Sequence, residues 1–318
     1  MGDNIFEGIT LEELLKPDIE EDIGNGEVTE EQKLPNVYRG KALNGTELYQ
    51  MSAQQDINVI LVAGLFHSGK TTMEMALYQM FLRGMNSKLQ FAGSKTLIDV
   101  AERSRGLRVI SGSPVPTVAR TSKAVEDKYL HISIMDTEQR SHDLIFTDFS
   151  GEVFECNNSD DIDSSLKQFR RLRHVLILVD GEKLAGKLKD QALVDCKRVL
   201  SLLLQQEIVG DSTIVHIVYS KNDIIAQSPN PNIEKIIENN NDILLEMIGN
   251  RKNNFRVHRI SAISRDTSIV GNYEGLEELI LSCLDSWSDE KKEMKDSDYV
   301  YAERVLARRS FDKFAWKE

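Results

Sequence analysis

One short run of residues constrains this chain more than any other feature. The run reads G-x-x-x-x-G-K-[ST] and consists of Gly64, Leu65, Phe66, His67, Ser68, Gly69, Lys70 and Thr71. A β-branched apolar segment, 57–63, precedes it, and a segment with apolar residues at helical spacing, 70–82, follows it. Strand, glycine turn and helix in this order favour a phosphate-binding loop over the alternative, an ordinary glycine turn before a helix.

Each residue type in the run suits a nucleoside triphosphate. Gly64 and Gly69 allow the backbone to turn its N–H groups toward the β-phosphate. Lys70 carries a charge that can reach the β- and γ-phosphates, and Thr71 offers a hydroxyl to Mg²⁺. The start of a helix attracts anions as well. We therefore predict that the run, together with Thr72, binds a nucleoside triphosphate and Mg²⁺.

A second motif follows the apolar strand that begins at Leu144, where Asp148 and Gly151 read D-x-x-G. An acid at a strand end beside a phosphate loop can hold Mg²⁺ through water, and a following glycine can present its N–H to the γ-phosphate. Taken alone, this short pattern favours an acidic turn after a strand. It gains weight only together with the other motifs.

A third motif indicates which base is bound. A β-rich run, 212–219, leads into Ser220, Lys221, Asn222 and Asp223, close to the guanine-reading pattern [NT]-K-x-D. Asp223 can accept hydrogen bonds from two N–H groups of guanine, while the stem of Lys221 lies along the ring. Adenine has no matching pair of donors, so such a site selects against ATP.

A fourth motif, Ser261 and Ala262, ends the strand predicted at 255–260. It is similar to the turn that contacts the guanine carbonyl through a backbone N–H. Each motif taken singly also fits a solvated turn at a strand end. Four of them, in order and at strand ends, predict GTP and GDP as ligands.

The motifs together resemble those of GTPases of the class that contains translation factors and small GTPases (TRAFAC). More narrowly, the segments 91–97, 120–121 and 144–152, with Phe154, are similar to the bacterial double-GTPase families of predicted conflict and phage-defence gene clusters. The resemblance covers roughly residues 36–287. It implies a GTP-operated switch or motor component that works with the products of neighbouring genes.

Several positions depart from that pattern. Phe66 and His67 are bulky where small GTPases commonly have small residues, and bulk there can hinder an arginine inserted by a partner. Ser220 replaces the usual Asn or Thr. Glu152 stands where many GTPases have a glutamine that orients water, and its charge adds to that of the γ-phosphate. We therefore expect hydrolysis to be slow without a partner.

A loop rich in Pro, Gly and Thr, 111–122, has the composition of a segment that changes with the bound nucleotide. Thr121 is the candidate for contacting Mg²⁺ and the γ-phosphate, with Thr117 second. Arg120 can supply a positive charge to the transition state, or it can be an ordinary solvent-facing arginine. The predicted catalytic set is Glu152, Arg120, Gly151 and Lys70.

Strands and helices alternate along the chain, which predicts an α/β fold with a doubly wound, mostly parallel sheet and the nucleotide at the carboxyl ends of the strands. Beyond those named above, we expect strands at 129–135 and 174–180 and helices at 188–208, 231–248, 275–287 and within 96–109. We divide the chain into an acidic, largely disordered extension (1–35), a GTPase domain (36–287) with an inserted segment at about 85–120, and a charged tail (288–318).

Composition limits the partners and the compartment. The net charge of -12 argues against nucleic acid. The three cysteines and six histidines lack metal-ligand spacing, so we expect packed histidines, no zinc site and a reducing cytoplasm. No apolar run approaches membrane-spanning length, and the acidic start is no secretory signal. The segment 299–316 mixes apolar and basic residues; folding back on the domain is favoured over docking to a partner or a membrane.

These observations predict a Mg²⁺-dependent GTPase that switches a regulatory or effector protein, which by the resemblance is encoded in the same gene cluster. One alternative is a GTP-sensing scaffold that does not hydrolyse GTP, suggested by Glu152, Phe66 and His67. Another is a P-loop kinase, which residues 220–223 disfavour because kinases need no guanine reader. Single-turnover phosphate release separates the GTPase from the scaffold.

Overall fold

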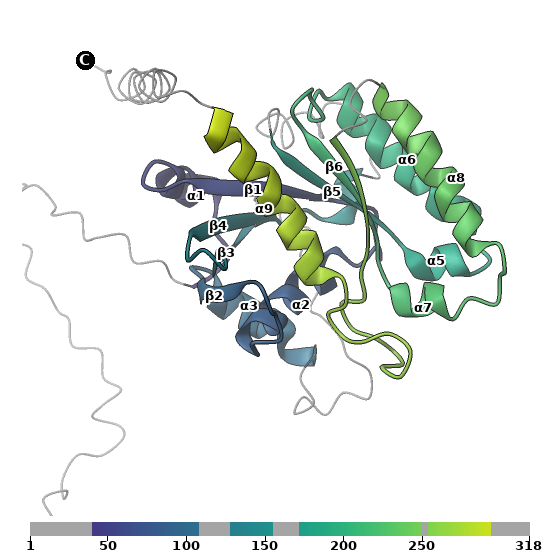
Figure 1. The fold of residues 1–318 in the computed structure, drawn as a ribbon, viewed down its shortest axis with the longest axis horizontal. Helices are drawn as coiled ribbons and strands as arrows, with labels where there is room; N and C mark the ends of the chain where they lie inside the picture. Colours follow the sequence, from purple (N-terminus) through teal and green to yellow (C-terminus); the bar gives the residue numbers. More distant parts are fainter. Residues whose placement is uncertain (1–39, 108–127, 155–171, 250–253, 294–318) are drawn as a thin grey trace, which may run out of the picture. The chain divides into compact units, whose positions relative to one another are not determined.

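The computed structural model describes residues 40–107, 128–154, 172–249 and 254–293, and for 106–107, Glu152 and 285–293 it describes the backbone only. The acidic extension, the segment 299–316 and the predicted switch loop with Thr117, Arg120 and Thr121 therefore lie outside the described residues. Within the described part, one seven-stranded sheet lies between two layers of helices (Figure 1).

The sheet has the strand order β2-β3-β4-β1-β5-β6-β7. Its strands are β1 Ile57–Ala63, β2 Gln90–Gly93, β3 Tyr129–Met135, β4 Ser141–Thr147, β5 His174–Val179, β6 Ile214–Tyr219 and β7 Phe255–Arg259. From β4 through β1, β5 and β6 to β7 every pairing is parallel, while β3 is antiparallel to β4 and β2 to β3. Every residue of β5 and β6 is buried, as expected for central parallel strands covered on both faces. The predicted doubly wound, mostly parallel sheet is confirmed.

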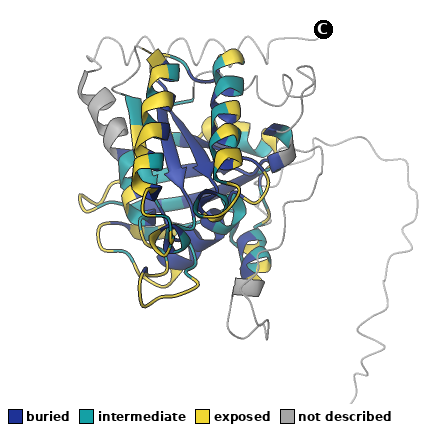
Figure 2. Cartoon of the chain, turned by 90° about the vertical axis from the view of Figure 1, so that its right-hand side faces the viewer, coloured by how far each residue is buried: buried dark blue, intermediate teal, exposed yellow. Residues whose placement is uncertain are grey.

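Helices cover both faces of this sheet. They are α1 Gly45–Ser52, α2 Lys70–Leu82, α3 Leu97–Arg103, α5 Gly181–Ala185, α6 Lys189–Gln205, α7 Asn222–Ala226, α8 Ile233–Ile248 and α9 Leu276–Glu293, with 3-10 turns at Ser104–Leu107 and Gly151–Phe154. One apolar layer joins α1, α6 and α8 to one face, and a second joins α2, α3 and α9 to the other. Figure 2 shows the strands buried between helices whose outer surfaces are exposed.

The predicted and observed elements agree best at the centre of the sheet. The strand expected at 57–63 and the helix expected at 70–82 have those bounds. The inserted helix expected within 96–109 is a shorter α3 that continues as a 3-10 turn. None of the helices in the described ranges is both long enough and apolar enough to cross a membrane.

One side chain joins distant parts of the described chain. Glu277, in the first turn of α9, accepts hydrogen bonds from the backbone N–H groups of Ser87, Lys88 and Leu89 at 2.8, 2.6 and 3.2 Å. The Ser87 hydroxyl donates to the second carboxylate oxygen of Glu277 at 2.9 Å. The loop between α2 and β2 is therefore fastened to the last described helix.

Candidate functional site

The four sequence motifs lie at one edge of the sheet. The glycine-rich run follows β1, Asp148 follows β4, residues 220–223 follow β6, and residues 261–262 follow β7. Since β4, β1, β5, β6 and β7 are parallel, their carboxyl ends share that edge. Ligands of open α/β sheets bind at this edge.

The glycine-rich run turns between β1 and α2 with both of its glycines in left-handed conformations. Gly64 has φ 154° and Gly69, the residue before α2, has φ 94°, in a region that side chains rarely adopt. The Lys70 ammonium donates to the carbonyls of Gly64 at 2.5 Å and Leu65 at 3.2 Å. The Ser68 hydroxyl is buried and lacks a hydrogen-bond partner among the described residues. An orphaned buried hydroxyl of this kind fits a loop that bonds phosphate oxygens.

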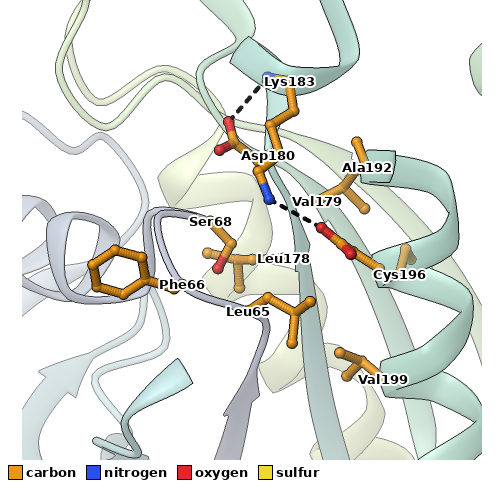
Figure 3. A pocket seen from close by; sticks show the side chains of 11 residues that line it. Leu65, Phe66, Ser68, Leu178, Val179, Asp180, Lys183, Ala192, Cys196 and Val199 are labelled. Carbon is orange, nitrogen blue, oxygen red and sulfur yellow. Dashed lines mark hydrogen bonds and ion pairs between the residues drawn. The ribbon is translucent and has the colours of Figure 1, made fainter. Parts of the chain in front are cut away.

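The side chains of the loop point in different directions (Figure 3). Leu65 turns toward α6 and lines a small hollow with Cys196 and Val199. The ring of Phe66 points away from that hollow and is 38% exposed. Leu65 therefore anchors the loop to the core, while Phe66 stands at the open side of the site beside His67, with ring centroids 3.9 Å apart.

The D-x-x-G turn lies directly against this loop. A Cβ atom on Gly151 would lie 2.6 Å from the backbone nitrogen of Phe66, so only glycine fits there without a shift. Asp148, at the end of β4, is 6% exposed. Thr71 lies in the first turn of α2. Thr71 and Asp148 offer a hydroxyl and a carboxylate, which are oxygen donors that suit Mg²⁺. Glu152 follows within a 3-10 turn.

Asp148 also contacts a residue that motif analysis missed. Arg103, the last residue of α3, forms an ion pair with Asp148 through one terminal nitrogen, and its Nε lies 3.1 Å from Asp99. Glu74 of α2 is fully buried nearby; burial raises the pKa of its carboxyl, and the charge of Asp148 raises it further. The only sequence signal for Arg103 is its spacing of four residues from Asp99 on a helix.

The predicted guanine motif, 220–223, is hydrogen-bonded to the glycine-rich run. The Ser220 hydroxyl lies 2.8 Å from the carbonyl of Ser68 and 3.0 Å from that of Val179. Ser220 thus links β6, β5 and the loop, although it departs from the usual Asn or Thr. Lys221 has φ 54° and its ammonium lies 2.8 Å from Asp180.

Asp223 is held in a fixed orientation. It is 1% exposed, and its two carboxylate oxygens accept from the Ser261 hydroxyl at 3.3 Å and from the Arg265 N–H at 2.9 Å. The Ser261 N–H donates to the carbonyl of Glu274 at 3.0 Å. Ala262 is then the neighbouring position whose N–H can serve a base carbonyl.

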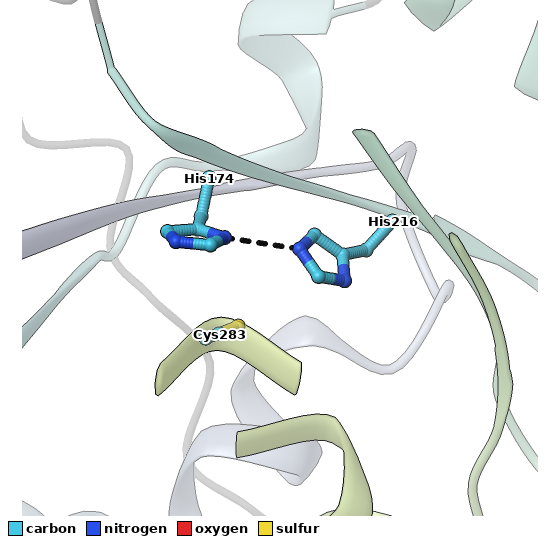
Figure 4. Close-up of side chains that lie close together, drawn as sticks. All are labelled: His174, His216 and Cys283. Carbon is cyan, nitrogen blue, oxygen red and sulfur yellow. Dashed lines mark hydrogen bonds between the residues drawn. The ribbon is translucent and has the colours of Figure 1, made fainter. Parts of the chain in front are cut away.

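A chain of three histidines lies within the sheet, under α9. The ring nitrogens of His174 and His216 lie 3.0 Å apart, and those of His216 and His258 also lie 3.0 Å apart. Figure 4 shows Cys283 of α9 beside the first pair, with the potential ligand atoms of His174, His216 and Cys283 within 4.8 Å of one another. Because the histidines already satisfy one another by hydrogen bonds, we interpret them as packed side chains.

Comparisons with known proteins place the chain in a family. No curated protein matches it. Matching chains of solved structures number 196; one, a crystal structure of a mutation variant of SsGBP, is 12% identical with a TM-score of 0.36 and is matched over 77% of this chain and 59% of that one. This chain spans less than two thirds of that structure, and a likeness at this TM-score carries no argument. The profile described as Double-GTPase 2 matches residues 58–284, which include all four motifs, and the chain therefore belongs to the Double-GTPase 2 family.

Proposed function

We propose that this protein is a Mg²⁺-dependent switch that binds and hydrolyses GTP and thereby regulates a partner protein. Membership of a double-GTPase family implies GTP binding and hydrolysis at the general level. The residue roles, the metal, the switching and the partner are our proposal. We also propose that the chain divides at residues 35 and 287, and that the protein is cytoplasmic. The buried, free thiols of Cys196 and Cys283 support the cytoplasmic location.

The observation that carries the proposal is the hydrogen bond from the Ser220 hydroxyl to the Ser68 carbonyl. It connects the residues that would read the base to the loop that would hold the phosphates. A nucleotide bound there would contact both through one rigid unit, so base identity and phosphate binding are coupled. This supports a guanine nucleotide over a phosphate-only ligand.

The roles that we propose for the described residues follow the geometry of the site, and the role of Thr121, which lies outside the described residues, follows from the sequence alone. Residues 64–72 hold the phosphates, with Lys70 giving up the loop carbonyls to meet them. Thr71, Asp148 and Thr121 hold Mg²⁺, which when bound offsets charge on the β- and γ-phosphates. Gly151 lies against the loop, and we assign it the role of sensing the γ-phosphate.

Base selection gives the direct test. In Asp223→Asn, the Arg265 N–H requires the amide oxygen on its side, so the amide nitrogen faces Ser261 and the base. We expect GTP affinity to fall and xanthosine triphosphate affinity to rise, changing their ratio by about a hundredfold. Competition binding with the two nucleotides measures this ratio.

A matched control makes the same chemical change at an exposed carboxylate. Asp266 follows Arg265 in the chain, is exposed, and accepts hydrogen bonds from the N–H and the hydroxyl of Ser268 at 3.0 and 2.6 Å. Asp266→Asn should therefore leave the preference between the two nucleotides unchanged. An unchanged ratio in Asp223→Asn would contradict the guanine assignment.

Hydrolysis separates the switch from its main alternative. Under single-turnover conditions, a switch releases phosphate from bound GTP, and a sensing scaffold retains GTP intact. We expect slow but measurable release from the wild-type protein, because Glu152 stands where many GTPases have glutamine. GTP recovered unchanged after prolonged incubation with Mg²⁺ would favour the scaffold.

A further inference from the structure

Arg103 brings a positive charge to the carboxylate that we assign to Mg²⁺. The guanidinium pairs with Asp148, and the two side chains are only 11% and 3% exposed. Two cations beside one carboxylate repel each other, and burial keeps water from screening them. Arg103 and Mg²⁺ therefore oppose each other at Asp148.

A second acceptor for Arg103 is already present in the same cluster. Glu74 is 1% exposed, and neither of its carboxylate oxygens has a hydrogen-bond partner among the described residues. The Nη1 atom of Arg103 is likewise buried without a partner there. Buried polar groups in folded proteins are nearly always paired, so an orphaned acceptor and an orphaned donor in one cluster call for an explanation.

We propose that Arg103 is a positioning residue that exchanges between two carboxylates, pairing with Asp148 when Mg²⁺ is not bound there and with Glu74 when it is. This inference rests on the proposed function, because it takes Asp148 as a Mg²⁺ residue. The guanidinium can form two parallel hydrogen bonds with a carboxylate, which suits both oxygens of Glu74, and its positive charge offsets the cost of ionising that buried carboxyl.

The exchange would couple the metal to a whole helix. Arg103 is the last residue of α3, and the 3-10 turn that follows ends at Leu107, shortly before the predicted switch segment 111–122. Moving the guanidinium from the end of β4 to α2 changes what holds this end of α3. Mg²⁺ binding is thereby communicated to the chain that leads into the switch segment.

The test is a Mg²⁺ titration of the full-length protein with GDP bound, followed by calorimetry. Arg103→Gln removes the competing charge and should tighten Mg²⁺ binding at least about fivefold. Glu74→Gln weakens the alternative pair and should loosen Mg²⁺ binding at least about fivefold. In the double variant the Glu74 change should have little further effect, because no guanidinium remains to be accepted.

Arg105→Gln is the matched control, since it removes the same charge from an exposed position two residues away. It should change Mg²⁺ affinity by less than about twofold. Mg²⁺ binding in Arg103→Gln that is equal to or weaker than in the wild type would overturn the proposal. So would a Glu74→Gln effect that persists in the double variant, because Glu74 would then act on Mg²⁺ through its charge and not through Arg103.

Amide hydrogen exchange, measured on the wild-type protein, tests the change of Arg103 partner without any substitution. This measurement serves if a variant does not fold. Backbone amides of 97–107 should exchange at different rates when Mg²⁺ is added to the GDP-bound protein, and unchanged rates would contradict the proposal. Failure of the wild-type protein to bind GDP would instead contradict the proposed function, so the two failures are distinguishable.

Discussion

At Gly151 a single added methyl group would meet the backbone of the phosphate loop. The new Cβ atom would lie 2.6 Å from the nitrogen of Phe66 and 2.8 Å from the carbonyl carbon of Leu65. Since neither atom belongs to a flexible side chain, we expect Gly151→Ala to displace the loop and weaken GDP binding about tenfold or more. Calorimetry measures the loss. Gly45→Ala, whose Cβ would meet nothing within 4 Å, should bind GDP like the wild type; equal affinities in both variants would contradict the contact.

We propose that hydrolysis depends on Glu152 and Arg120, whose side chains the structure does not describe. If Glu152 orients the attacking water and Arg120 offsets charge in the transition state, alanine at either position should lower single-turnover hydrolysis at least about tenfold and leave GTP affinity within a few fold. Glu152→Gln should hydrolyse GTP as fast as wild type or faster, because it removes a charge near the γ-phosphate. If all three variants match the wild type, neither side chain is catalytic.

At the scale of single residues, the sequence predicts chemistry that is local in the chain. The phosphate loop and the guanine motif are short patterns, so their residue types and spacing can be recognised directly. The ion pair between Arg103 and Asp148 joins residues that are 45 positions apart. Glu74 lies in α2, which follows β1, whereas Asp148 follows β4. No periodicity indicates such contacts, because they depend on how α2, α3 and β4 pack.

At the scale of elements, the histidine chain ties three strands together through neutral side chains. Burial, aided by the charge of Arg173, lowers the pKa of His174 to about 4, and burial with the charge of Arg256 lowers that of His258 to about 4. Burial also lowers the pKa of His216. All three are therefore neutral in the fold near pH 7.

This arrangement predicts a loss of stability in mild acid. A histidine in the unfolded chain titrates near pH 6.5, so below about 6.5 and down to about 4 the unfolded state binds more protons. The free energy of unfolding should therefore fall as pH is lowered, by at least about 2 kcal/mol between pH 7 and 5. Urea unfolding at both values measures the change.

The control for this prediction is the exposed His67. The substitution His67→Asn introduces an amino acid that tolerates the φ of 65° at this position. It should leave the pH dependence of the free energy of unfolding unchanged. His174→Asn should reduce the dependence, because the amide cannot take up a proton. A stability that is the same at pH 7 and 5 would show that the three histidines do not titrate in this window.

Short edge elements are the hardest to predict. β2 has four residues that are alternately exposed and half-buried, and it pairs with β3 along one side with a register shift. α1 has eight residues and one buried side chain, Met51. Segments this short contain too few apolar positions to show a period, whereas the strongly apolar β5 and β6 are evident from composition.

At the scale of the whole molecule, the sheet order brings the motifs together. β1 is the middle strand of the sheet, with β4, β3 and β2 on one side and β5, β6 and β7 on the other. The loop that follows β1 therefore lies between the ends of its neighbours β4 and β5. The alternation of strands and helices predicts this class of sheet. The strand order itself depends on the packing of the two apolar layers, which the sequence pattern does not specify.

The bonds that Glu277 makes to residues 87–89 also bear on when the protein can finish folding. A ribosome releases the loop before β2 long before it releases α9, and the carboxylate that fastens this loop is 190 residues later in the chain. Until α9 emerges, the face of the sheet that it covers remains open, and exposed apolar surface promotes aggregation. A nascent chain of this protein therefore depends on its last described helix to close the sheet, so chaperone protection would matter most during late synthesis.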